Sequence, residues 1–139
     1  MGLIRENALR KLRHCKMENR VQVTAIYASL LALMFVGLSI RTPSMRRRLK
    51  IAIGDAGNSE MLRAMRVHSN LAEYVPLGLL LMLLAARSGA NAMLVHFLGL
   101  TLLAGRISRA YGVSLNQENY RFRVAGVAMT FTSLIASSL

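Results

Sequence analysis

Three long stretches of this chain contain no Lys, Arg, Asp or Glu: residues 21–40, 88–105 and 124–139. They are twenty, eighteen and sixteen residues long, and about twenty apolar residues are needed to cross the hydrocarbon core of a bilayer as a helix. A fourth stretch, residues 62–86, carries charge only near its start and at Glu73. The pattern predicts an all-α protein, a membrane bundle of four antiparallel helices.

The composition agrees with this prediction, because the chain is both apolar and strongly basic. Of its 139 residues, 54% are hydrophobic, yet 18 Lys and Arg stand against only 6 Asp and Glu. A soluble domain rarely combines the two extremes. Four helices enclose little interior for buried polar groups, so we expect the chain to form an oligomer. The single cysteine, Cys15, excludes an intrachain disulfide.

Residues 1–16 are interpreted as a basic extension, and residues 17–139 as the membrane domain. The extension lacks the apolar core and the cleavage site of a signal peptide. Met17 is one candidate for the natural start, because starting there removes five of the six basic residues before the first span. The alternatives are a basic amphipathic helix on an anionic membrane surface and an unstructured tail.

The distribution of basic residues predicts how the bundle is oriented. Residues 41–66 contain seven Lys and Arg, residues 106–123 contain four, and the connection between them contains only Arg87. Positively charged loops stay in the cytoplasm, so the first and third connections are expected there and both termini on the other side. The six basic residues in positions 1–20 conflict with this orientation.

The first connection contains Pro43, a basic run at residues 46–50 and a glycine-rich segment at residues 54–58. Proline and glycine are expected to end the first helix here and to form a turn. The basic run is expected to contact anionic phospholipid headgroups, at about 1 kcal/mol per charge. Nucleic acid is a poor candidate partner, because the charges flank membrane spans and no aromatic residues are interleaved with them.

A polar stripe is predicted on the second helix. Arg63, Arg66, Asn70 and Glu73 follow one another at spacings of three, four and three residues, which places them on one helix face. Arginines that end the third helix and begin the fourth reach the same membrane level: Arg106, Arg109, Arg121 and Arg123. Guanidinium groups bind carboxylates bidentately, so this site suits a small anionic or zwitterionic ligand beside a groove that admits an apolar one.

Structural roles are the competing interpretation of these side chains. Terminal arginines also extend to phospholipid headgroups, and a contact between Arg66 and Glu73 would hold helices together. His68 lies about 100° around the helix from the stripe, and His96 stands alone in the third span. Neither has partners at the spacing of metal ligands, so no metal site is predicted.

Several segments resemble the MAPEG family, the membrane-associated proteins in eicosanoid and glutathione metabolism. The main one is Arg66-Val67-His68-Ser69-Asn70-Leu71-Ala72-Glu73-Tyr74-Val75-Pro76, which resembles the second-helix signature of the family. The preceding Gly54-Asp55-Ala56-Gly57-Asn58 with Glu60 is similar to the small bacterial branch, and later blocks match at Gly105-Arg106, Arg109 to Gly112 and Arg123 to Gly126. The resemblance covers residues 21–139. It implies a homotrimer in the bacterial inner membrane, with glutathione held between neighbouring subunits near the cytoplasmic face.

The resemblance also implies roles for individual residues. The implied glutathione contacts are Arg66, Asn70, Glu73 and Tyr74 on the second helix, Arg106 and Arg109 on the third, and Arg41 at the end of the first. Arg123 matches the arginine that stabilises the glutathione thiolate, and a fixed cation nearby lowers the pKa of a thiol. The implied activity is that of a glutathione transferase or peroxidase-like enzyme acting on a hydrophobic electrophile from the bilayer.

Three positions depart from the eukaryotic members of the family. Arg109 stands where they carry His or Tyr, Val113 stands where they carry Tyr, and Val127 stands where one branch carries Tyr. These differences argue against prostaglandin or leukotriene synthesis. They leave open a non-catalytic membrane protein or scaffold that holds a lipid or another thiol in the same pocket. A proton or ion pathway is disfavoured, because the first and fourth helices carry almost no ionisable residues.

Overall fold

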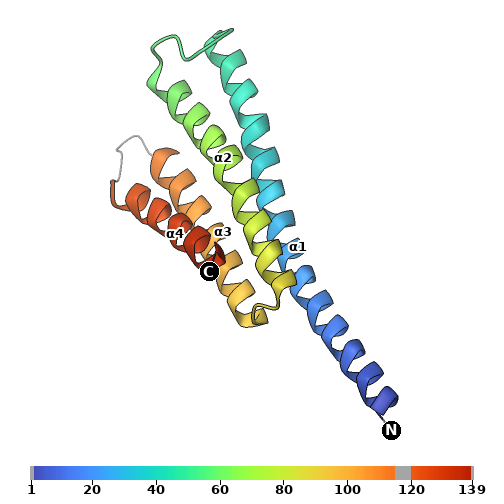
Figure 1. Ribbon diagram of the computed structural model, residues 1–139. Helices are drawn as coiled ribbons and strands as arrows, with labels where there is room; N and C mark the ends of the chain where they lie inside the picture. Colours follow the sequence, from blue (N-terminus) through green and yellow to red (C-terminus); the bar gives the residue numbers. More distant parts are fainter. Residues whose placement is uncertain (1, 115–119, 139) are drawn as a thin grey trace.

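A computed structural model describes residues 2–114 and 120–138 of the chain. The described residues form four helices and no strand: α1 (Gly2–Leu49), α2 (Ser59–Ser88), α3 (Ala92–Ser114) and α4 (Tyr120–Ser138). Figure 1 shows two antiparallel pairs, α1 with α2 and α3 with α4, packed against each other, and α2 contacts each of the other three helices. The predicted all-α, antiparallel four-helix bundle is confirmed.

The surface of the bundle is apolar over much of its length. Residues 5–49 of α1 and all of α2 are long and apolar enough to cross a membrane, judged by length and composition. Large apolar side chains such as Leu33, Ile40 and Phe97 are more than half exposed. The buried core is small and includes Leu31, Met82, Val95, Leu98 and Leu102. An exposed apolar surface of this kind is expected of a protein that contacts lipid or other membrane helices.

α1 does not end at Pro43, so that expectation from the sequence is wrong. The helix runs through the proline to Leu49, although proline has no N–H to donate to the carbonyl of Ser39, four residues before it. Hydroxyl groups on either side of Pro43 donate to carbonyls of the preceding turn: Thr42 to Leu38 O at 3.0 Å and Ser44 to Ile40 O at 2.8 Å. Such hydrogen bonds help a membrane helix to tolerate proline.

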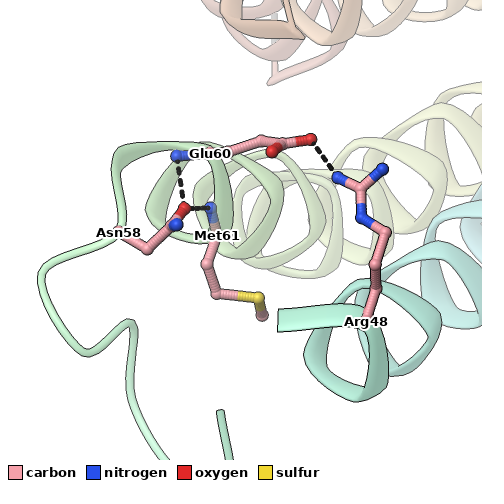
Figure 2. A network of polar contacts seen from close by, with 4 residues as sticks. All are labelled: Arg48, Asn58, Glu60 and Met61. Atoms are coloured by element: carbon pink, nitrogen blue, oxygen red, sulfur yellow. Dashed lines mark hydrogen bonds and ion pairs between the residues drawn. The ribbon is translucent and has the colours of Figure 1, made fainter. Parts of the chain in front are cut away.

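The predicted turn is present, but it begins at Lys50 instead of at Pro43. Gly54 and Gly57 have φ angles of 69° and 75°, in the left-handed region that glycine adopts without strain. The next helix starts at a capped end, where Asn58 Oδ1 accepts the N–H groups of Glu60 and Met61, each at 3.0 Å (Figure 2). Glu60 also pairs with Arg48 at 2.7 Å, which ties the start of α2 to the end of α1 (Figure 2).

α3 and α4 approach closely where Gly105 meets Gly126. A Cβ atom on Gly126 would lie 2.8 Å from the carbonyl oxygen of Gly105, and one on Gly105 would lie 3.1 Å from the carbonyl oxygen of Gly126. Small residues at such crossings let membrane helices pack backbone to backbone. The resulting register brings Thr130 of α4 to Arg106 of α3.

The basic extension, residues 1–16, is helical from Gly2 onward and continues α1 without a break. Figure 1 shows it running past the end of the other three helices. It lies at the end of the bundle that holds the α2–α3 connection, because a Cβ on Gly89 would lie 3.8 Å from Nη1 of Arg20. The extension is therefore at the opposite end from the α1–α2 turn.

Candidate functional site

A groove of about 590 Å³ lies between α1, α2 and α3, near the α1–α2 turn. α2 supplies most of its wall, because residues three and four apart on a helix share one face. Four of the predicted site residues line the groove: Arg66, Asn70, Glu73 and Arg109. Arg46, Arg63, His68 and Ser69 complete most of the polar lining. The polar stripe of α2 is therefore gathered at one concave surface with cations from all three helices.

Arg66 and Glu73 do not form the structural contact that the sequence left open. Glu73 accepts a hydrogen bond from the hydroxyl of Ser69 at 2.8 Å. In residues 2–114 and 120–138, the ion pairs join His14 to Glu18 and Arg48 to Glu60, and none joins Arg66 to Glu73. Both side chains are exposed at the groove. A ligand can therefore meet a cation and a carboxylate that do not neutralise each other.

Arg106 lies behind the groove wall instead of lining the groove. Its residue is only 3% exposed, and Nη1 donates to Asn70 Oδ1 at 2.8 Å and to the Asn70 carbonyl at 3.4 Å. Nη2 donates to the hydroxyl of Thr130. The sequence expectation named Arg106 as a direct ligand contact, whereas its described hydrogen bonds are to Asn70 and Thr130.

Tyr74 also faces the interior of the bundle. The guanidinium carbon of Arg106 lies 5.4 Å from the centroid of the Tyr74 ring, in cation–π geometry. The Tyr74 ring also contacts the ring of Phe131 on α4, edge to face, with the ring centroids 6.1 Å apart. Tyr74 therefore packs against α3 and α4, and it is absent from the lining of the groove.

Arg41 lies on a different face of α1 from the groove. It lines a separate hollow of about 360 Å³ together with Ser44, Met45, Arg48 and Glu60. It also does not end α1, since the helix continues to Leu49. Within this subunit, Arg41 is therefore not brought together with Arg66, Asn70 and Glu73.

Arg123 lies in the first turn of α4, which begins at Tyr120. Its side chain falls outside the described residues, as do those of Tyr120 and Arg121.

Arg46 and His68 are among the groove residues that sequence reasoning did not assign to the site. Arg46 was interpreted as part of a headgroup-binding run, but its Nη1 donates to the Gly54 carbonyl at 2.9 Å and so fastens the turn beside the groove. His68 was placed to one side of the stripe, but it lines the groove and its Nε2 lies 2.9 Å from Ser39 Oγ. The spacing of Arg46 to Arg48 does not say which arginine faces inward, because that depends on how far α1 continues.

An apolar hollow of about 350 Å³ lies between α1 and α2, farther from the α1–α2 turn than the groove. Its lining comes from α1 and α2 and includes Leu31, Phe35, Leu71, Val75 and Pro76. Leu71 follows Asn70 directly in the sequence, so the hollow begins within one helical turn of the polar groove. The polar groove and the apolar hollow are thus neighbours on α2.

A family model and two curated proteins match most of this chain. The family model described as MAPEG family matches residues 24–139, a range that contains every residue lining the groove. Inner membrane protein YecN of Escherichia coli strain K12 is 37% identical over 113 residues, which cover 81% of this chain and 85% of that protein. The same values hold for inner membrane protein YecN of Escherichia coli O6:H1.

Proposed function

This chain belongs to the MAPEG family, and from this we propose that it is an integral membrane enzyme that activates the thiol of glutathione. The activated thiol attacks a hydrophobic electrophile, as in a glutathione transferase or a peroxidase-like enzyme. We place the protein in the bacterial inner membrane, in keeping with its relatives in Escherichia coli and with its exposed apolar helices.

The charge pattern of the groove is the observation that carries this proposal. Glutathione has two carboxylates and one ammonium group, and the groove offers Arg66 and Arg109 as guanidinium donors and Glu73 as a carboxylate. A guanidinium binds a carboxylate with two parallel hydrogen bonds, and a carboxylate accepts readily from an ammonium. The volume of about 590 Å³ is in the usual range for a small-molecule site.

Arg123 is proposed as the residue that stabilises the thiolate. A fixed cation beside a thiol lowers its pKa, so a larger fraction of the thiol is ionised at neutral pH. The thiol proton passes to water, the thiolate sulfur forms a bond to the electrophilic carbon, and the leaving group departs with the electron pair of the broken bond. The apolar hollow beside the groove would hold the electrophile close to the sulfur, which accelerates the reaction by proximity.

We propose that the working unit is a homotrimer with glutathione between neighbouring subunits. Arg41 supports this arrangement, because it lines a hollow on a face of α1 away from the groove of its own subunit. The exposed apolar surface of the bundle also supplies area for contact between copies. Phospholipid would cover the rest of that surface.

The groove is proposed to open toward the cytoplasm. It lies at the end of the bundle that carries the α1–α2 turn, where residues 41–66 contain seven basic residues. Basic connections of this kind remain on the cytoplasmic side of a bacterial inner membrane. Glutathione from the cytoplasm would then enter from water, and the electrophile would enter from the bilayer.

Ultraviolet difference absorbance tests the proposal directly. Purified protein is titrated with glutathione at neutral pH, and a thiolate band is expected that disappears in Arg123→Ala. Arg87→Ala is the matched control, because it removes the same charge from an exposed position at the other end of α2. A thiolate band of equal size in Arg123→Ala would contradict the assigned role of Arg123.

A non-catalytic binding protein or scaffold is the second candidate. Arg109 and Val113 favour it, because eukaryotic members carry His or Tyr at the first position and Tyr at the second. Such a protein would hold a lipid or another thiol in the same groove. Saturable binding of glutathione without a thiolate band, and without conjugation of any electrophile, is the result expected of this alternative.

A further inference from the structure

Asn70 is a groove residue whose side chain is oriented by a buried residue of a neighbouring helix. Its side-chain oxygen accepts from Arg106 Nη1 at 2.8 Å, and a guanidinium can only donate, so the oxygen must face Arg106. The side-chain NH₂ group of Asn70 is therefore turned away from Arg106. Since Asn70 also lines the groove, this orientation leaves amide hydrogens to donate to a carboxylate there.

Arg106 can fix Asn70 only if Arg106 itself is held in place. Its second terminal nitrogen, Nη2, donates to the hydroxyl of Thr130 on α4. Thr130 is 1% exposed and Arg106 is 3% exposed, so water does not compete for this contact. A hydrogen bond to a charged group in such a buried place is stronger than one at the surface.

The Thr130 side chain is held by the backbone of the preceding turn of α4. The hydroxyl donates to the Gly126 carbonyl at 2.8 Å, so its lone pairs are left to accept from Arg106. The close approach of Gly105 and Gly126 brings α4 near enough for this contact. The hydrogen bonds thus run from α4 through α3 to α2, in the order Thr130, Arg106, Asn70.

We propose that Thr130 is a positioning residue for the groove: through Arg106 it turns the side-chain amide of Asn70 toward a carboxylate of the bound ligand. Thr130 itself does not touch the ligand. The predicted effect of Thr130 on the affinity for glutathione rests on the proposed function. Its predicted effect on the orientation of Asn70 is independent of the proposed function. The two parts are therefore tested by separate measurements.

The first measurement is the affinity for glutathione. Thr130→Val removes the hydroxyl at nearly the same volume, and we expect Kd and KM for glutathione to rise about tenfold, with a smaller change in kcat. Thr130→Ser keeps a hydroxyl and should restore a Kd close to that of the wild type. Thr130→Ala removes the hydroxyl without added bulk and serves if the valine variant does not fold.

Thr132→Val is the matched control on the same helix. Thr132 is exposed and its hydroxyl bonds only to the Ala128 carbonyl among the described residues, at 2.8 Å. The Kd of Thr132→Val for glutathione should equal that of the wild type. The proposal is wrong if Thr130→Val and Thr132→Val bind glutathione equally well, or if Thr130→Ser is as weak as Thr130→Val.

The second measurement needs no ligand. In protein labelled with ¹⁵N-asparagine, the side-chain amide resonances of Asn70 are identified by their loss in Asn70→Ala. They should shift in Thr130→Val, return in Thr130→Ser and stay unchanged in Thr132→Val. Unchanged Asn70 resonances in Thr130→Val would overturn the positioning role. A shift in a protein that binds no glutathione would support that role and refute the glutathione part of the proposed function.

Discussion

A buried guanidinium organises the polar interior of this bundle at the scale of single residues. Arg106 donates to Asn70 and Thr130 and stacks on Tyr74, while its Nε has no hydrogen-bond partner among the described residues. Removing one partner of a buried charge costs more than the hydrogen bond itself is worth, because the charge stays desolvated. Arg106 and its partners should therefore tolerate substitution less well than the exposed arginines of the groove.

The carboxylate of Glu73 belongs to the same scale, and its proposed role predicts a specific loss. In Glu73→Gln, Kd for glutathione should rise about tenfold, because an amide accepts from an ammonium less strongly than a carboxylate does. A glutathione analogue that lacks the α-ammonium group should bind wild type and variant equally. Isothermal titration calorimetry measures all four affinities.

Glu18→Gln is the control for this prediction. Glu18 is exposed in the N-terminal part of α1, where it lies 3.8 Å from His14, and exposed pairs contribute little. Both ligands should bind this variant as they bind the wild type. If Glu73→Gln weakened glutathione and the analogue to the same degree, Glu73 would not be the partner of the ammonium.

At the scale of helices, three charge-free stretches and the largely apolar residues 62–86 were enough to predict four helices, and the basic connections were enough to predict their alternating direction. The end of the first helix was not predictable, because α1 passes Pro43 with the help of hydroxyls on Thr42 and Ser44. The stripe on α2 followed from its spacing. The spacing could not predict which arginines face the groove. Arg106 is turned inward by its contact with Thr130, and that contact is set by the packing of α4 on α3.

That packing depends on the glycine pair, which gives a prediction about stability. Gly126→Ala places a methyl group 2.8 Å from the Gly105 carbonyl oxygen and 3.0 Å from Cβ of Arg109. The helices must separate, and overpacking of this kind costs about 1 to 3 kcal/mol. The midpoint of unfolding in a denaturing-detergent titration should fall accordingly.

Gly37→Ala is the matched substitution on α1. A Cβ there would meet no atom within 4 Å, and alanine favours a helix by up to about 1 kcal/mol over glycine. Its midpoint should equal or exceed that of the wild type. Equal loss of stability in both variants would mean that the α3–α4 crossing is not the cause.

At the scale of the whole molecule, the bundle has two chemically different ends. The end with the α1–α2 turn carries the groove and seven basic residues in residues 41–66. The other end carries the α2–α3 connection and the basic extension of α1. Both ends are therefore rich in positive charge. The basic residues of the N-terminal extension still conflict with the orientation that the basic connections predict.

Site-specific labelling decides which end faces the cytoplasm. Cys15 is the sole cysteine and is exposed, so a membrane-impermeant maleimide should label it in cells whose outer membrane alone has been permeabilised. In a Cys15→Ser background, Ile53→Cys, at a position 90% exposed in the turn, should react only after the inner membrane is broken. The reverse pattern would place the groove in the periplasm.

The unbroken α1 helix also makes this small protein easier to image. With 48 residues at about 1.5 Å per residue it is about 70 Å long, more than twice the roughly 30 Å of the hydrocarbon core. A helical partner fused in register to Gly2 would share one rigid axis with the bundle and serve as a fiducial in electron microscopy. Each residue added at the junction would rotate that fiducial by about 100° around the axis.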